Sequence, residues 1–450
     1  MNRALPILIF LAALLFFFVS EKMDFTTPQE DKHVKTVKFW AFSIPAKTML
    51  SLKTDFEERH PDIRVEVQTI PWESLQQKTL WAIAAGSDVP DVIVGSSEWT
   101  GGLINSGGLE PLDKWFKGDE KDDFFKKFFP TTLGIYQYPE VRRDRPEWRG
   151  GRTQYGVPLD LDLMLIFYRA DILDPIITKL GMNGFPQSWE GMEKLGRALR
   201  DESGGNSPTR FLLYLDPDDP VPMSMAFLPS SGGHYLSPDF SRATFNDLAS
   251  RKAFEFFESL LTQKIATRWE RNTMEDPIVL YKKDQALANI AGPWYAKVLE
   301  SKAPEQAGKW RVALFPRREP QFPTSGLGGA CLAIPHNAQN KREAVELIEY
   351  MCSDRFALSY FQRVGSPPPI ISAWNDPVFK QPHPYFGGQV IYDVVNEAIQ
   401  AARPIQMMPN TEVTKGPVRW ALREIAVRGA APEEVLNKAA ARADAILAGH

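Results

Sequence analysis

The stretch GGACLAIPHNAQNKREAVELIEYM, residues 328–351, combines a short apolar run, a polar turn and an amphipathic segment. The apolar run at residues 330–334 is typical of a buried strand, and Pro335 ends it. Apolar residues then recur at helical spacing over residues 344–351. The stretch therefore predicts a buried strand, a turn and a helix in immediate succession.

The N-terminal third of the chain repeats this alternation. Apolar or alternating runs at residues 34–42, 64–70 and 90–95 predict strands. Helical spacing at residues 48–60 and 75–85 predicts helices between them. Such alternation indicates a parallel α/β sheet, and ligands bind at the carboxyl ends of the strands of these sheets.

Three further segments complete the pattern. They are PDVIVG followed by GGLINSGGLEPLD (residues 90–113), YGVPLDLDLMLIFYRADIL (155–173) and AGPWYAKVL (291–299). With residues 328–351, these segments resemble the bacterial extracellular solute-binding proteins of family 1, the maltose-binding-protein-like components of sugar-importing ABC transporters. The resemblance covers most of residues 34–448 and is weakest at residues 117–150 and 201–245.

The resemblance implies an α/β fold of the periplasmic-binding-protein-like type II class. In this fold, two α/β lobes are joined by three crossing segments, and the ligand cleft lies between the lobes. The expected lobes are both discontinuous: residues 37–155 and 316–364 form lobe 1, and residues 156–315 and 365–450 form lobe 2.

The N-terminus has the features of an export segment. Residues 1–3 begin the chain with a positive charge, and residues 5–19 form an almost unbroken apolar run. We therefore expect residues 1–20 to be either a cleaved signal peptide or an uncleaved membrane anchor, and residues 21–36 to form a flexible stalk. The predicted location is periplasmic or extracytoplasmic.

Composition limits the classes of function. The net charge of -4 among 450 residues gives no basic field for nucleic acid. The 12% aromatic content suits both large cores and flat ligand-stacking surfaces. The two cysteines, Cys331 and Cys352, form no disulfide scaffold or metal pattern. We expect two separately buried thiols in preference to a disulfide between them.

The resemblance also implies ligand-contacting residues. Trp294, after a Gly-Pro turn, would stack on a sugar face, or pack in the core behind the hinge. Glu98 would accept hydrogen bonds from sugar hydroxyls, or stabilise a helix N-terminus. Trp99 stands where the family often has a basic residue. Asp160 and Asp162 lie two residues apart, so both carboxylates would face one side of a strand, and one of them would stabilise the hinge.

A second group of candidates lies near the expected cleft. Trp40 would form an aromatic wall or a core contact, Tyr235 would stack from the second lobe, and His234 is expected at the surface. The remaining candidates are polar or glycine positions beside the crossings: Ser43, Gly328, Gly329, Arg363 and Ser366.

The function predicted from these features is closure of two lobes over a carbohydrate and its delivery to the permease subunits of an ABC transporter. The chain is expected to act as a monomer. We also expect no enzymatic activity, metal or cofactor, because no phosphate loop, zinc spacing or serine elbow occurs. Two alternatives stay open. One is a binder of a polyamine, a glycerol phosphodiester or a peptide, and the other is a tethered polysaccharide-processing enzyme or glycan receptor.

Overall fold

The computed structural model describes residues 34–115, 119–139, 152–238, 240–268, 277–405 and 412–448. The predicted signal peptide or anchor and most of the predicted stalk lie outside these residues. Among the helices that the structure describes, none is long and apolar enough to cross a membrane.

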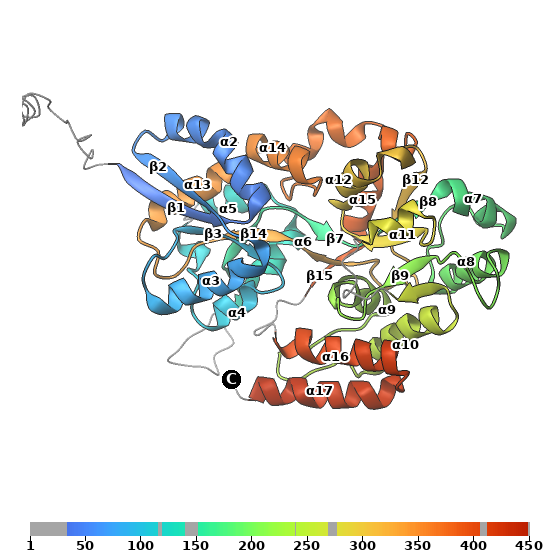
Figure 1. Cartoon of the computed structure of the whole chain (residues 1–450). Helices are drawn as coiled ribbons and strands as arrows, with labels where there is room; N and C mark the ends of the chain where they lie inside the picture. The colour runs from blue at the N-terminus through green and yellow to red at the C-terminus, as the bar shows by residue number, and fades with distance from the viewer. Residues whose placement is uncertain are drawn as a thin grey trace, which may run out of the picture.

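Two bodies make up the molecule (Figure 1). The first lobe contains a five-stranded sheet in the order β2-β1-β3-β14-β6. Its strands are β1 (Lys35–Ala41), β2 (Ile63–Thr69), β3 (Val92–Ser96), β14 (Ala330–Ala333) and β6 (Gly156–Pro158). β1 pairs in parallel with β2 and β3, whereas β14 runs antiparallel to β3 and β6.

Helices cover this sheet on both faces, so β3, β6 and β14 are buried along their whole length. The predicted strand and helix of residues 328–351 are confirmed as β14 and α13. The first-lobe helices and the β4–β5 ribbon are α2 (Ser43–Arg59), α3 (Trp72–Ala85), α4 (Thr100–Asn105), α5 (Asp119–Lys126), α6 (Pro130–Leu133), α13 (Lys341–Met351), α14 (Asp354–Val364), β4 (Gln137–Pro139) and β5 (Arg152–Gln154).

The second lobe is built around the antiparallel sheet β11-β8-β12 and a parallel pair, β9 and β10. These strands are β8 (Leu165–Arg169), β9 (Leu213–Leu215), β10 (Ala266–Arg268), β11 (Ala288–Ala291) and β12 (Trp310–Leu314). Its helices are α7 (Ala170–Lys179), α8 (Trp189–Glu202), η3 (Met223–Phe227), α9 (Leu228–Ser231), α10 (Leu248–Thr262), α11 (Ile278–Lys282), α12 (Tyr295–Lys302), α15 (Ile391–Ala401), α16 (Glu412–Arg428) and α17 (Pro432–Ala448).

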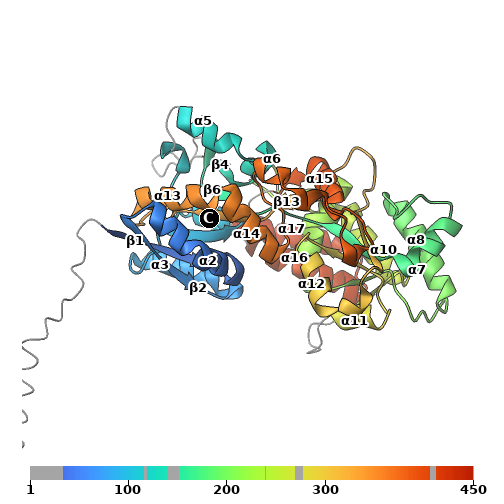
Figure 2. The same ribbon diagram turned by 90° about the horizontal axis from the view of Figure 1, so that it is seen from above.

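Short 3-10 turns occur in both bodies. They are η1 (Leu112–Lys114), η2 (Gly134–Tyr136), η4 (Pro304–Gln306), η5 (Ser372–Asn375), η6 (Pro377–Lys380) and η7 (Pro384–Phe386). The two bodies lie side by side along the long axis of the molecule, also when it is seen from above (Figure 2).

A small sheet between the bodies, here called the crossing sheet, contains β7 (Asp162–Leu163), β13 (Gly326–Gly328) and β15 (Arg403–Pro404) in the order β15-β13-β7. The predicted lobe boundaries stay predictions. The first predicted boundary lies between residues 155 and 156. Strand β6 begins directly after it, at Gly156, and pairs with β14 in the first-lobe sheet.

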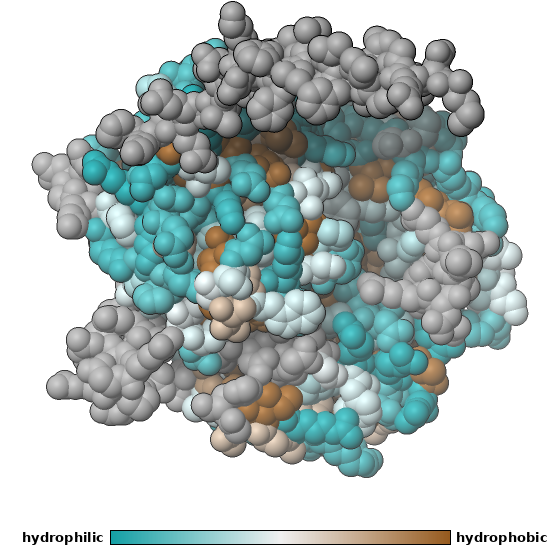
Figure 3. Space-filling model, turned by 60° about the vertical axis from the view of Figure 1, so that its left-hand side comes forward, coloured by the Kyte–Doolittle hydropathy of each residue, from teal (hydrophilic) through white to brown (hydrophobic). Residues whose placement is uncertain are grey.

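Each lobe has its own core, and a third hydrophobic cluster runs between them. It extends from Trp40 in β1 through Leu163 and Leu327 of the crossing sheet to Trp310 in β12. Both cysteines are buried and free, which confirms that they are separate thiols. On the face shown in Figure 3, hydrophilic residues cover most of the surface, and hydrophobic residues form separate small groups.

Candidate functional site

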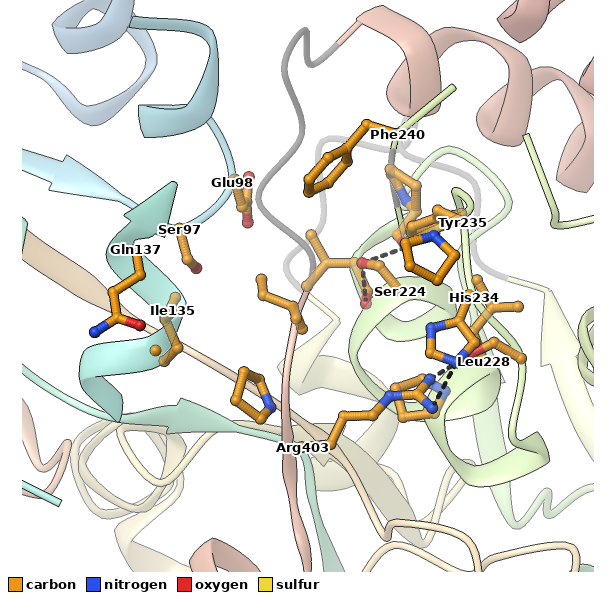
Figure 4. A pocket seen from close by; sticks show the side chains of 18 of the residues that line it. Ser97, Glu98, Ile135, Gln137, Ser224, Leu228, His234, Tyr235, Phe240 and Arg403 are labelled. Atoms are coloured by element: carbon orange, nitrogen blue, oxygen red, sulfur yellow. Dashed lines mark hydrogen bonds between the residues drawn. The ribbon is translucent and has the colours of Figure 1, made fainter. Parts of the chain in front are cut away.

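A cavity of about 310 Å³ opens between the two lobes. Figure 4 shows side chains from the first lobe on one side and side chains from the second lobe on the other. The first wall includes Ser97, Glu98, Ile135, Gln137 and Tyr138, the second includes Ser224, Leu228, His234, Tyr235 and Phe240, and β15 contributes Arg403. This combination of apolar rings and a few convergent polar groups is typical of a small-molecule site.

Glu98 follows β3 at the carboxyl end of the first-lobe sheet, as the sequence predicts. Its backbone N–H donates to the Ser96 hydroxyl at 3.1 Å, and its carboxylate is half-buried at the cavity wall. The neighbouring Ser97 is held by Gly329, whose carbonyl accepts the Ser97 N–H at 3.0 Å and whose N–H donates to the Ser97 hydroxyl at 3.2 Å. The crossing segment therefore fixes the first wall.

Two aromatic rings meet at the cavity, one from each lobe. Tyr138 in β4 and Phe240 stack with ring centroids 5.7 Å apart and an interplanar angle of 26°. Phe240 has a φ of 59°, in the left-handed region that bulky residues rarely occupy. Such strain persists only where the surroundings impose it, and it is common at ligand sites.

The second wall includes a buried phenol and an exposed imidazole. Burial raises the pKa of Tyr235 far above its ordinary value, so its hydroxyl stays protonated and able to donate a hydrogen bond. His234 lies at the surface, as predicted, and also lines the cavity. Its pKa is lowered, first by burial and then by the positive charge of Arg403. The imidazole is therefore mainly neutral near pH 7.

The carboxylate of Asp160 is bonded within the protein. One oxygen accepts the Ala330 N–H at 2.7 Å, and the other accepts the Tyr360 hydroxyl at 2.9 Å. Burial raises the pKa of Asp160, and these two hydrogen bonds oppose the rise. Asp160 lies outside the residues that line the cavity, and it joins the first crossing to β14 and α14.

Asp162 has a different environment, although it is only two residues away. Its Oδ1 atom is buried and makes no hydrogen bond within the part of the chain that the structure describes. Burial, followed by the negative charges of Asp160 and Glu98, raises the pKa of Asp162 to about 7, and the nearby indole of Trp294 opposes this rise. A side chain at Gly292 would collide with this carboxylate, so the glycine allows the turn before Trp294 to approach it.

Trp294 itself is 36% exposed, at the start of α12, and it lies outside the cavity lining. Its ring makes an edge contact with Tyr295, with centroids 5.7 Å apart. Of the residues predicted from the sequence to contact the ligand, Glu98 and Tyr235 line the cavity.

Four candidates are core or surface residues. Trp40 and Trp99 are buried in the hydrophobic cluster between the lobes, and the Lys78 ammonium lies 4.2 Å from the ring centre of Trp40. Ser43 is exposed at the first position of α2. Arg363 is exposed near the end of α14, and its guanidinium donates to the Ser51 hydroxyl at 3.0 Å.

The remaining candidates lie in the crossings. Ser366 is buried just after α14. Gly329 has a φ of 139°, and a Cβ there would lie 2.5 Å from the Asp160 carbonyl oxygen. A Cβ at Gly328 would lie 2.6 Å from the Ser97 hydroxyl. Both glycines therefore let the crossing segments approach closely, and their role is in packing the hinge.

Sequence reasoning missed most of the cavity wall, including Gln137, Tyr138, Phe240 and Arg403. The first two belong to a three-residue strand, Phe240 lies in a loop, and Arg403 belongs to a two-residue strand. None of these segments is long enough to show periodicity. For Arg403, the sequence held one signal: the Arg-Pro pair that follows α15. The residue before a proline favours an extended conformation, so this pair indicates an extended segment after the helix. Within the described residues, no group of three His, Cys, Asp or Glu side chains could hold a metal ion.

Two α/β lobes, a crossing sheet and a cavity between the lobes define a two-lobed solute-binding protein. A model of the bacterial extracellular solute-binding protein family matches residues 43–356, more than half of the chain. The chain therefore belongs to this family. Its description as extracellular places its members outside the cytoplasm.

Known proteins agree with this assignment. The lactose-binding protein of Rhizobium radiobacter is 22% identical over 374 residues, which cover 79% of this chain and 80% of the relative. The sugar-binding protein MalE from Xanthomonas citri has a TM-score of 0.78 at 22% identity, covering 92% of this chain and 98% of that one. UgpB from Mycobacterium tuberculosis, solved with glycerophosphocholine, has a TM-score of 0.71 at 20% identity, covering 92% and 98%. The structural likenesses confirm the type II periplasmic-binding-protein fold.

Proposed function

We propose that this protein is the solute-binding component of an ABC importer and that its solute is a carbohydrate held between the two lobes. The observation that carries this proposal is the cavity, in which the Glu98 carboxylate and the Gln137 amide lie near the Tyr138–Phe240 pair. Carboxylates and amides bind sugar hydroxyls, and aromatic rings pack against the C–H faces of sugar rings. The named sugar-binding relatives support the same choice.

Binding, and not hydrolysis, is the proposed activity. A glycosidase places two carboxyl groups on either side of the scissile bond. Here both Asp160 oxygens are bonded to the protein, and neither Asp160 nor Asp162 lines the cavity. This geometry supports a binder.

In the proposed mechanism, the solute contacts both walls and so favours the arrangement in which the lobes are close together. Glu98 binds from the first lobe, and Ser224 and Tyr235 bind from the second. A ligand shifts such an equilibrium by its differential affinity for the two arrangements. The closed form would then dock on the permease subunits as a monomer, with the N-terminal apolar run serving as an export signal or as a membrane tether.

The test is a thermal-shift screen of the full-length chain, kept in solution with a mild detergent. The panel holds neutral and acidic mono- and oligosaccharides, polyamines and glycerol phosphodiesters. A ligand at one hundred times its Kd stabilises the folded state by about 2.7 kcal/mol, which raises the midpoint measurably. We expect at least one saccharide to do so.

The matched variants are Glu98→Gln in the cavity wall and Glu58→Gln at an exposed position of α2. Each removes one negative charge with little change of shape. We expect Glu98→Gln to weaken saccharide binding by roughly tenfold, since hydrogen bonds to charged groups contribute about 1.5–3 kcal/mol. Glu58→Gln should bind like the unmodified chain. Shifts from polyamines or phosphodiesters alone would contradict the carbohydrate assignment and keep the two-lobed binder.

A further inference from the structure

Arg403 places a cation in the wall of the cavity. It lies in β15 of the crossing sheet and is half-buried. Its guanidinium Nη1 lies 3.2 Å from the His234 Nε2 atom, and its Nη2 donates to the Gly233 carbonyl. An arginine has five N–H donors in a planar fork. Contacts with these two residues leave donors of the Arg403 fork available at a cavity-lining position (Figure 4).

This cation has no carboxylate partner among the residues that the structure describes. Two other arginines are paired with acids: the buried Arg169 with Asp171 and Asp284, and the half-buried Arg251 with Glu433. At Arg403, burial lowers the pKa, and no neighbouring acid opposes this effect. Removing a charge from water is costly unless a counter-charge compensates for it.

The neighbours of Arg403 do not supply that counter-charge. His234 is mainly neutral near pH 7, and the Gly233 carbonyl contributes only a dipole. The Asp247 carboxylate acts on His234 but is paired with Arg242 at 3.7 Å. The carboxylate in the cavity wall is that of Glu98, which comes from the opposite lobe and lies across the cavity from Arg403 in Figure 4. The cavity therefore has a cationic end at β15 and an acidic end after β3.

We propose that Arg403 and His234 form an anion subsite and that the solute is an acidic saccharide, one that carries a carboxylate or a phosphate group. This inference rests on the proposed function and names the class of sugar. The fork of Arg403 binds the anionic oxygens, and the His234 imidazole lies beside them as a second contact. Planar two-point recognition of carboxylate and phosphate is the chemistry for which arginine is suited.

The polarity of the cavity then sets the orientation of the solute. The anionic group lies at β15, and the neutral hydroxyls lie toward Glu98, because a carboxylate repels an anion and accepts hydrogen bonds from hydroxyls. The Tyr138 and Phe240 rings remain for a sugar face. A neutral sugar in the same cavity would bury the Arg403 charge further without compensation.

The test is isothermal titration calorimetry of the full-length chain in mild detergent, with digalacturonic acid, its neutral counterpart galactobiose, galactose 6-phosphate and galactose. We expect at least one acid to bind about tenfold to a hundredfold more tightly than its neutral partner. Arg403→Met should remove this preference by weakening the binding of the acid much more than the binding of the neutral sugar. Arg403→Lys, which keeps the charge and loses the fork, should retain part of the preference.

Arg64→Met, at an exposed position of β2, is the matched control and should keep the full preference.

If Arg403→Met does not fold, the salt dependence of binding to the unmodified chain tests the anion subsite instead, because only the acid should lose affinity as ionic strength rises. Equal affinity for acid and neutral sugar overturns the anion subsite and leaves the proposed function standing. Glycerophosphocholine is titrated as a further probe, and binding of none of the probes overturns the anion subsite. An equal loss of all ligands in Arg403→Met also overturns it, since that result means a purely structural role. Binding of glycerophosphocholine and of no saccharide would keep the anion subsite and refute the carbohydrate assignment.

Discussion

The crossing sheet and the cavity lie next to each other, yet they use their polar groups differently. In the crossing region, Asp160 has a protein partner on each oxygen, and the Ser325 hydroxyl accepts from Met164 N–H at 2.7 Å and donates to the Met225 carbonyl at 2.9 Å. In the cavity wall, the Arg403 fork keeps donors beyond its two contacts. Asp160 and Ser325 hold the crossing region together, whereas the fork of Arg403, which also belongs to the crossing sheet, keeps donors for a solute.

This difference separates effects on stability from effects on binding. A substitution in the crossing region should change the free energy of unfolding first, because it leaves a buried partner unsatisfied. A substitution in the cavity wall should change the affinity for the solute first. The three predictions below would sharpen or break this separation.

The largest effect that does not depend on pH is expected for Asp160→Ala. The substitution leaves the Ala330 N–H and the Tyr360 hydroxyl without their acceptor in a buried site. We expect the free energy of unfolding to fall by about 3 kcal/mol, as for other buried polar networks. Urea denaturation measures it, with Asp160→Asn as the control of similar shape, which should cost less. A loss below about 0.5 kcal/mol would show that the crossing region does not depend on this carboxylate.

A pH-dependent effect, which reaches its full size only above pH 7, is expected for Asp162→Asn. Because the pKa of Asp162 rises from an ordinary 3.8 to about 7 in the folded state, the folded chain binds more protons than the unfolded chain between these pH values. Stability contributed by this residue is therefore greatest at low pH and is lost as pH rises toward 7.

The amide variant cannot ionise, so it should be more stable than the unmodified chain at pH 8, by up to about 4 kcal/mol, since one pKa unit corresponds to about 1.36 kcal/mol. The difference should shrink toward pH 4. Thermal midpoints of both proteins across this range provide the measurement. A difference that stays constant with pH would mean that Asp162 is ionised throughout.

The smallest effect concerns the contact between the walls. A double-mutant cycle with Tyr138→Leu and Phe240→Leu should give a coupling free energy of about 0.5–1.5 kcal/mol, the usual range for an aromatic pair. Urea unfolding of the four proteins measures the coupling. A value near zero would show that these rings do not join the lobes and serve the solute alone.

Much of the framework followed from local pattern. Buried strand β3 matches the predicted residues 90–95 closely, and α3 extends the predicted helix by one turn toward its N-terminus. Glu98 was predictable because a buried parallel strand delivers the residues after it to the carboxyl edge of the sheet. Local periodicity and this edge rule needed no tertiary information.

The cavity was less predictable because distant segments build it. Arg403 and His234 are 169 positions apart, and their contact depends on how β15 enters the crossing sheet. Trp40 was predicted as a cleft wall or a core contact, and Trp99 was placed at the cleft by its position after a strand. Both pack into the cluster between the lobes, where a large apolar surface stabilises more than it would at an exposed edge. Aromatic content alone does not distinguish these two uses.

The shortness of the crossing sheet has a kinetic consequence. β7 and β15 each have two residues, and each joins β13 through two residue pairs. With so few backbone hydrogen bonds, the crossing sheet offers little resistance to bending, and rigid-body domain motions take microseconds to milliseconds. A bound solute leaves no faster than the lobes open. Its residence time therefore depends on this small sheet as well as on the residues that touch it.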